Sequence, residues 1–174
     1  MMEIEKWLND VLEKKNKRAM PIITFPAATK LNISVKKLIN DTDQQVAALK
    51  IIKEECNPLA ILGFMDLSVE AECFGAEIKV TDNEVPTVVG QLIEDEDDAQ
   101  ALKVPAVGSG RSQLYIDAIK KTKAEIKDIP ILGGCIGPFS LAGRLMDVSE
   151  AMINCYEEPE MVHIVLEKAT KFLI

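Results

Sequence analysis

Residues 59–65 read Leu-Ala-Ile-Leu-Gly-Phe-Met, and Asp66 follows them directly. This run is apolar, comes just after a proline and is too short for a surface helix, so it predicts a strand buried on both faces. A second run, Ile129–Gly133, predicts another strand. Because amphipathic stretches separate the two runs, the order predicts βα units around a parallel sheet, which is an α/β fold.

The sequence around these two runs carries further helix and strand signals. The motif Thr42-x-x-Gln45 has the capping-box arrangement and predicts a helix that ends near Glu55. Apolar residues at helical spacing predict more helices over residues 111–127 and 159–174. Pro21–Phe25 predicts a short buried strand near the start of the chain.

Both ends of the chain are predicted to be helical. Residues 1–20 are expected to form an N-terminal helix that buries one stripe, made of Ile4, Trp7, Leu8, Val11 and Leu12. The last helix reaches Ile174 on an apolar face and has no capping glycine. We expect such an end to be followed by more structure or covered by a partner.

The composition is that of an ordinary globular domain. The 174 residues are 48% hydrophobic and 28% charged, which excludes a disordered or collagen-like chain. A formal net charge of -8 argues against a nucleic-acid partner, which would need a basic surface. No apolar run reaches the roughly 18 residues that cross a bilayer, and the charged N-terminus does not resemble a signal peptide. We therefore expect a cytoplasmic protein without a membrane partner, whose four cysteines are reduced thiols.

Two places at the ends of the predicted strands are candidates for chemistry. Asp66 ends an apolar run, and a carboxylate among apolar neighbours needs a partner or a substrate to offset its desolvation. The alternative is a helix cap or a hydrogen-bonded structural aspartate. The turn Gly133–Pro138 permits close approach of a ligand to its backbone and opens a helix that can attract an anion. It matches neither the dinucleotide fingerprint nor the Walker A loop, so a simple strand-to-helix turn is its alternative.

Other common catalytic patterns are missing from the sequence. His163 is the only histidine, and it falls inside the predicted last helix, where a structural role is the more common one. The chain has no zinc-protease or serine-hydrolase motif.

Four segments, taken together and in this order, resemble the uroporphyrinogen decarboxylase superfamily. They are Leu62–Glu77 with its Asp-x-x-x-Glu-Ala-x-x-x-Gly element, Pro86–Val89, Ile131–Gly143 with its Gly-Pro-Phe-Ser-Leu turn, and the stretch from Glu158 to Leu173. The resemblance implies a (β/α)8 TIM barrel, of which residues 21–174 would be the first part, because a complete barrel needs typically ~250 residues.

One branch of this superfamily, the decarboxylases of porphyrin biosynthesis, grips substrate carboxylates with an arginine-rich loop after the first strand. The matching place here reads Phe25-Pro-Ala-Ala-Thr-Lys30 and has no arginine. Lys30 cannot replace two bidentate guanidinium groups. A tyrosine of the decarboxylases near the Gly-Pro turn is also missing, and Arg144-Leu-Met146 stands there. Asp66 nevertheless matches their central aspartate.

The sequence is more similar to the second branch, the methylcobalamin:coenzyme M methyltransferases. The resemblance implies methyl transfer from a methylcobalamin held by a corrinoid protein to a thiol such as coenzyme M. It implies Asp66 as the catalytic residue, with Glu70 orienting it, and a set of ligand-binding residues. These are Thr24, Thr29, Glu70, Gly134, Gly137, Pro138 and Phe139.

Zinc in this branch is held by a His-x-Cys pair and a later cysteine in the second half of the barrel. This chain contains no His-x-Cys pair, so we expect it to bind no zinc alone and to be inactive by itself. Two alternatives stay open. The chain could be a uroporphyrinogen decarboxylase, or a non-catalytic half-barrel that assembles with itself or with another chain through its exposed apolar faces.

Overall fold

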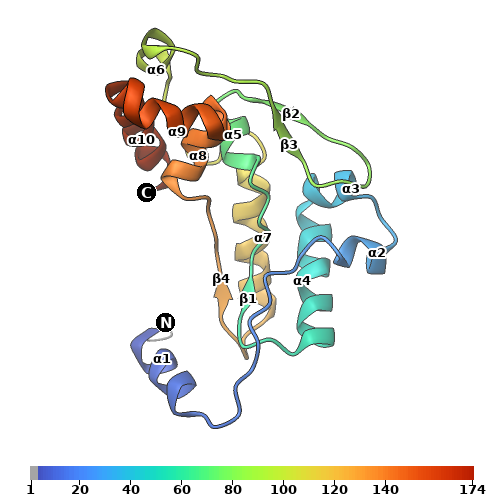
Figure 1. The fold of residues 1–174 in the computed structure, drawn as a ribbon. Coiled ribbons are helices and arrows are strands. Elements are labelled where there is room, and N and C mark those ends of the chain that lie inside the picture. Colours follow the sequence, from blue (N-terminus) through green and yellow to red (C-terminus); the bar gives the residue numbers. More distant parts are fainter. Residues whose placement is uncertain (1–3) are drawn as a thin grey trace.

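The computed structural model describes residues 4–174, and residues 1–3 of the predicted N-terminal helix lie outside the described part. Figure 1 shows two groups of helices joined by extended segments, with the N-terminal helix apart from both. The helices are α1 (Ile4–Glu13), α2 (Ala27–Leu31), α3 (Val35–Ile39), α4 (Thr42–Cys56), α5 (Val69–Cys73), α6 (Glu96–Ala101), α7 (Ser112–Glu125), α8 (Pro138–Met146), α9 (Val148–Glu157) and α10 (Pro159–Leu173). The strands are β1 (Ile61–Leu62), β2 (Glu77–Lys79), β3 (Thr87–Val89) and β4 (Ile131–Leu132).

The two predicted apolar strands pair with each other. β1 and β4 are parallel, with Ile61 opposite Ile131 and Leu62 opposite Leu132. The N–H groups of Ile61 and Gly63 each donate to a β4-side carbonyl at 2.9 Å. The parallel strand pair is therefore confirmed, although its ladder is shorter than the apolar runs. Within residues 4–174 the strands do not close into a barrel.

Two apolar cores support the strand pair. The first core joins β1 to α2, α3 and α4, and Leu38, Ile39, Ala48 and Leu49 have no exposed surface in it. The second core joins α5 to α8, α9 and α10, where Leu141, Leu145 and Val165 have no exposed surface. Helix α7 packs on α4 and on β4, so it lies beside the strand pair in Figure 1.

β2 and β3 form a separate antiparallel hairpin, with Ile78 opposite Val88. It extends away from the parallel pair above α3 and α4 in Figure 1. The acidic run that follows opens α6, because Asp95 caps this helix by accepting from the N–H of Asp98. Helix macrodipoles favour acidic residues at this end.

The predicted strand at Pro21–Phe25 is wrong. This stretch forms no ladder, and Ile22 and Ile23 are exposed. A single backbone hydrogen bond, from the N–H of Leu59 to the carbonyl of Ala19 at 2.7 Å, ties the preceding residues to the start of the β1 segment. A strand needs a continuous row of backbone partners, and one bond does not supply it.

The N-terminal helix is shorter than predicted and its stripe is not buried. α1 ends at Glu13, and none of its residues is buried. Leu12 keeps 72% of its surface exposed. None of the helices described over residues 4–174 is both long enough and apolar enough to span a membrane.

The capping box at the start of α4 is also wrong. Asp41, one residue earlier, is the N-cap and accepts from the N–H groups of Asp43 and Gln44. The Thr42 hydroxyl donates instead to the carbonyl of Leu114 on α7, at 3.2 Å. The side chain of Gln45 therefore takes no part in capping, and it is fully buried.

Candidate functional site

Asp66 lies beyond the end of β1, which stops at Leu62, and is buried, with 4% of its surface exposed. One carboxylate oxygen accepts from both the N–H and the hydroxyl of Ser68, at 3.0 and 2.5 Å. The other accepts from Arg111 at 2.7 Å and from the Tyr115 hydroxyl at 2.8 Å. The structure thus places Asp66 where the strand-end argument predicted and shows it hydrogen-bonded on both oxygens.

Arg111 connects Asp66 to a second carboxylate. Its guanidinium also donates to Glu72 at 2.6 Å and to the Ser68 hydroxyl at 3.0 Å. Burial disfavours its charge, but the hydrogen bond and the charge of Asp66 outweigh burial and raise the pKa of Arg111. Because the guanidinium stays charged, it supplies the positive charge that Asp66 needs in a buried place. We call Asp66, Ser68, Glu72, Arg111 and Tyr115 the Asp66 cluster.

Tyr115 is a donor in this cluster. Burial, followed by the neighbouring charge of Asp66, raises the pKa of the Tyr115 hydroxyl far above its ordinary value. The phenol therefore keeps its proton at any physiological pH and holds the carboxylate of Asp66 in one orientation. Its ring packs edge-on against Phe64, with 6.4 Å between the ring centroids.

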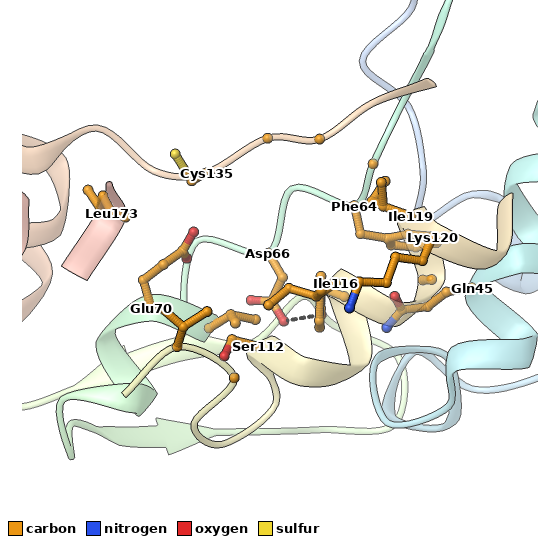
Figure 2. A pocket seen from close by; sticks show the side chains of 18 of the residues that line it. Gln45, Phe64, Asp66, Glu70, Ser112, Ile116, Ile119, Lys120, Cys135 and Leu173 are labelled. Carbon is orange, nitrogen blue, oxygen red and sulfur yellow. Dashed lines mark hydrogen bonds between the residues drawn. The ribbon is translucent and has the colours of Figure 1, made fainter. Parts of the chain in front are cut away.

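A cavity of about 380 Å³ lies next to the cluster. It brings together three of the predicted site residues, Asp66, Glu70 and Gly134, and also exposes Cys135. In Figure 2, Glu70 and Leu173 lie at one end of the cavity, Asp66 near its middle, and Gln45 with Lys120 at the other end. A mostly apolar cavity with a few convergent polar groups is the usual form of a small-molecule site.

Glu70 contacts the glycine-rich turn. One of its carboxylate oxygens accepts from the N–H of Ile136 at 3.1 Å, which ties α5 to the segment after β4. Burial raises the pKa of Glu70, although the hydrogen bond from Ile136 opposes the rise. Among the described residues Glu70 makes no hydrogen bond to Asp66, whereas Ser68, Arg111 and Tyr115 do, so the orienting role of Glu70 stays a prediction.

The raised pKa of Glu70 gives a pH-dependent prediction. A carboxyl whose pKa is higher in the folded chain binds its proton more tightly when folded, so stability falls as pH rises from the unfolded value, near 4.5, through the folded one. Glu70→Gln keeps an acceptor for the N–H of Ile136 and removes the loss of stability that accompanies ionisation of the carboxyl. Relative to wild type, we expect the variant to gain less than about 1 kcal/mol at pH 7, because solvent screens part of the charge, and to gain nothing at pH 4.

Urea denaturation at both pH values measures the difference. Glu77→Gln, at an exposed carboxyl of β2, is the matched control and should change stability equally at both pH values. If Glu70→Gln showed the same pH slope as wild type, the assigned effect of burial would be wrong.

The turn after β4 is open to solvent. Gly137 caps α8 and Pro138 occupies its first turn, as the sequence predicted. A Cβ added at Gly133 or Gly137 would meet no atom within 4 Å, so the backbone of this turn faces open space. Phe139 is 43% exposed beside it. A flat ligand could therefore approach the backbone of this turn closely.

Five of the predicted ligand-binding residues do not line the cavity. They are Thr24, Thr29, Gly137, Pro138 and Phe139. Thr24 is buried and its carbonyl accepts from Ala27, whereas Thr29 is exposed on α2. Their assigned roles stay predictions.

Sequence reasoning missed Arg111 and Tyr115. A signal for Arg111 was present, because an arginine at the start of a helix is opposed by the helix dipole and so needs a carboxylate nearby. Nothing in the sequence alone indicated which carboxylate it would meet.

The described residues do not fit a metal centre. Over residues 4–174 no group of three or more His, Cys, Asp or Glu side chains is arranged to hold a metal ion.

Most of the region described above matches a known family. A sequence profile for uroporphyrinogen decarboxylase (URO-D) matches residues 16–174. The chain belongs to this family. The match includes the strand pair, the Asp66 cluster and the glycine-rich turn, so the predicted resemblance is confirmed.

Two curated relatives come from species of Methanosarcina. Over 82 residues the chain is 39% identical to the methylcobamide:CoM methyltransferase MtbA of Methanosarcina acetivorans and 34% identical to that of Methanosarcina mazei. Each alignment covers 46% of this chain and 24% of the relative, so the match extends over only part of the relatives' length.

A solved structure, described as a methyltransferase from Methanosarcina mazei, has the same fold. Its TM-score is 0.83 at 20% identity, and the match covers 99% of this chain and 53% of that one. At this identity the likeness establishes the fold alone. The chain therefore has a mixed α/β fold that corresponds to about half of that structure.

Proposed function

We propose that this chain forms the first half of a (β/α)8 barrel in a corrinoid-dependent methyltransferase. The reaction would move a methyl group from a methylcobamide on a corrinoid protein to a thiol such as coenzyme M. The observation that carries the proposal is the 39% identity to a methylcobamide:CoM methyltransferase. The strand pair supports it, because parallel strands separated by helices are the repeating unit of such a barrel.

The site supports the same proposal. Asp66 and the turn after β4 both follow parallel strands, and in barrels of this kind the reacting groups gather at those strand ends. The open glycine backbone of that turn offers a surface for the flat corrin ring. The Asp66 cluster would hold one wall of the barrel opening rigid, since both carboxylate oxygens of Asp66 are already hydrogen-bonded.

Tetrapyrrole decarboxylation is the less favoured function. Where the decarboxylases carry their arginine-rich loop, this chain places Ala27 and Ala28, which are buried at the start of α2. Lys30 in the same helix pairs with Glu55. No guanidinium is therefore available in this loop to bind substrate carboxylates in the two-pronged way.

Zinc binding belongs to the other half of the barrel in this proposal. When bound there, zinc would lower the pKa of the substrate thiol and so favour the thiolate. Titration of the purified chain with zinc, followed by calorimetry, should show no tight stoichiometric binding. Stoichiometric binding would contradict the assignment of the metal to the missing half.

The proposed reaction is tested by reconstitution. The chain is mixed with a polypeptide that covers the remaining length of the Methanosarcina acetivorans relative, and two assays run in parallel. Methylcobalamin with coenzyme M should yield the S-methyl thioether, detected by mass spectrometry, while uroporphyrinogen should yield no coproporphyrinogen. Each half alone is the control. The opposite pattern of products would replace the proposed function with the decarboxylase.

A further inference from the structure

Gln45 is a buried side chain that the site described above does not use. It has no exposed surface, although it lies in the first turn of α4, where a polar side chain would ordinarily face water. Its amide nitrogen donates to the carbonyl of Ile39 at 3.5 Å, and its amide oxygen has no partner among the described residues. A buried acceptor without a donor is rare in folded proteins and costs stability.

The cavity next to the Asp66 cluster reaches this side chain. Gln45 and Leu49 of α4 line its far end, together with Phe64, Ile116 and Ile119. Figure 2 shows Gln45 directed toward Ile116 and Lys120 at this end. Apart from Lys120 at the rim, this end of the cavity is apolar around a single unpaired oxygen.

Thr122 provides an internal comparison. Its hydroxyl is equally buried and also has no partner, but Thr122 does not line the cavity. Among residues 4–174, Gln45 alone has an unpaired buried atom on a residue that lines the cavity.

We infer that the end of the cavity between α4 and α7 binds a small, largely apolar molecule that donates one hydrogen bond to the amide oxygen of Gln45. The donor is a neutral hydroxyl or amide N–H. Apolar walls disfavour burying a charged group, and the Lys120 ammonium repels a cation at the rim. In the structure the amide nitrogen of Gln45 faces the carbonyl of Ile39 at 3.5 Å, and the amide oxygen is the atom without a partner among the described residues. This inference does not depend on the proposed methyl transfer.

Matched pairs of probes test the inference on the full chain. Phenol, cyclohexanol and benzamide each carry a neutral donor, and toluene, methylcyclohexane and acetophenone match their shapes without it. Binding is followed by NMR chemical-shift titration of the Gln45 side-chain amide and of the methyl groups of Ile116 and Ile119. At least one donor probe should bind about tenfold more tightly than its match, as expected for one hydrogen bond in a dry site.

Two variants assign that preference to the proposed atom. Gln45→Met keeps the length of the side chain and removes the acceptor, so it should abolish the tenfold preference. Thr122→Val removes the other unpaired atom and should leave the preference unchanged. Both variants should fold, since each loses an unpaired buried group. The inference is overturned if no donor probe binds, if each pair binds equally, or if Gln45→Met keeps the preference.

Discussion

Replacing Arg111 with methionine is expected to lower the free energy of unfolding by about 3–5 kcal/mol, the usual loss when one partner of a buried ion pair is removed. Methionine retains the apolar stem but leaves Asp66 buried with its charge unpaired. The side chain of Asp66 is 0% exposed and that of Arg111 is 10% exposed, so water cannot replace the lost guanidinium. Urea denaturation monitored by circular dichroism measures the loss.

Two further variants separate this effect from a general loss of charge. Lys121→Ala breaks an exposed ion pair with Asp43 and should change stability far less than Arg111→Met does. The double variant Asp66→Asn with Arg111→Met should lose about 2 kcal/mol less stability than the two single variants lose in sum. The reason is that removing one partner of the ion pair already removes the interaction of the other. A loss below about 1 kcal/mol for Arg111→Met would show that the Asp66 cluster is not held by this pair.

Leu145→Ala is expected to cost about 2–5 kcal/mol, the range for truncating a fully buried leucine. Leu145 is 0% exposed in the second core. Its backbone carbonyl accepts from the N–H groups of Leu92 and Ile93, at 2.8 and 3.1 Å, so α8 also anchors the segment after the β2–β3 hairpin. A cavity at this position would loosen both the core and that connection.

Leu12→Ala is the matched control for Leu145→Ala. It makes the same chemical change in a helix where the side chain is 72% exposed, and its effect should stay within about 0.5 kcal/mol. Equal losses for the two variants, measured by urea denaturation, would contradict the burial assigned to the second core.

The sequence predicted those elements whose signal is local. The two apolar runs became β1 and β4 because residues buried on both faces leave few other options, and Pro138 with Gly137 marked the start of α8 correctly. Pro21–Phe25 failed because the same composition forms a strand only where a neighbouring strand offers its backbone, and no local pattern records that.

In the candidate site, too, local signals were predicted and contacts between distant residues were not. Asp66 was predicted from its place at a strand end, but its partners are distant in sequence: Arg111 and Tyr115 lie 45 and 49 residues further along the chain. The capping motif failed because Asp41 accepts from the N–H groups of the first turn, while Thr42 bonds the carbonyl of Leu114 on α7. Tertiary packing decides such contacts, so residue spacing alone could not predict them.

We propose that these βα units are part of a ring which further βα units complete. The decisive experiment is hydrogen exchange of the chain, alone and mixed with the polypeptide covering the rest of the Methanosarcina acetivorans relative. β4 pairs only with β1 in the described residues, so its other edge has no strand partner there. We expect a one-to-one complex in which the amides of residues 129–134 exchange at least tenfold more slowly. A chain that forms no complex, or whose β4 amides exchange at an unchanged rate within one, would contradict it.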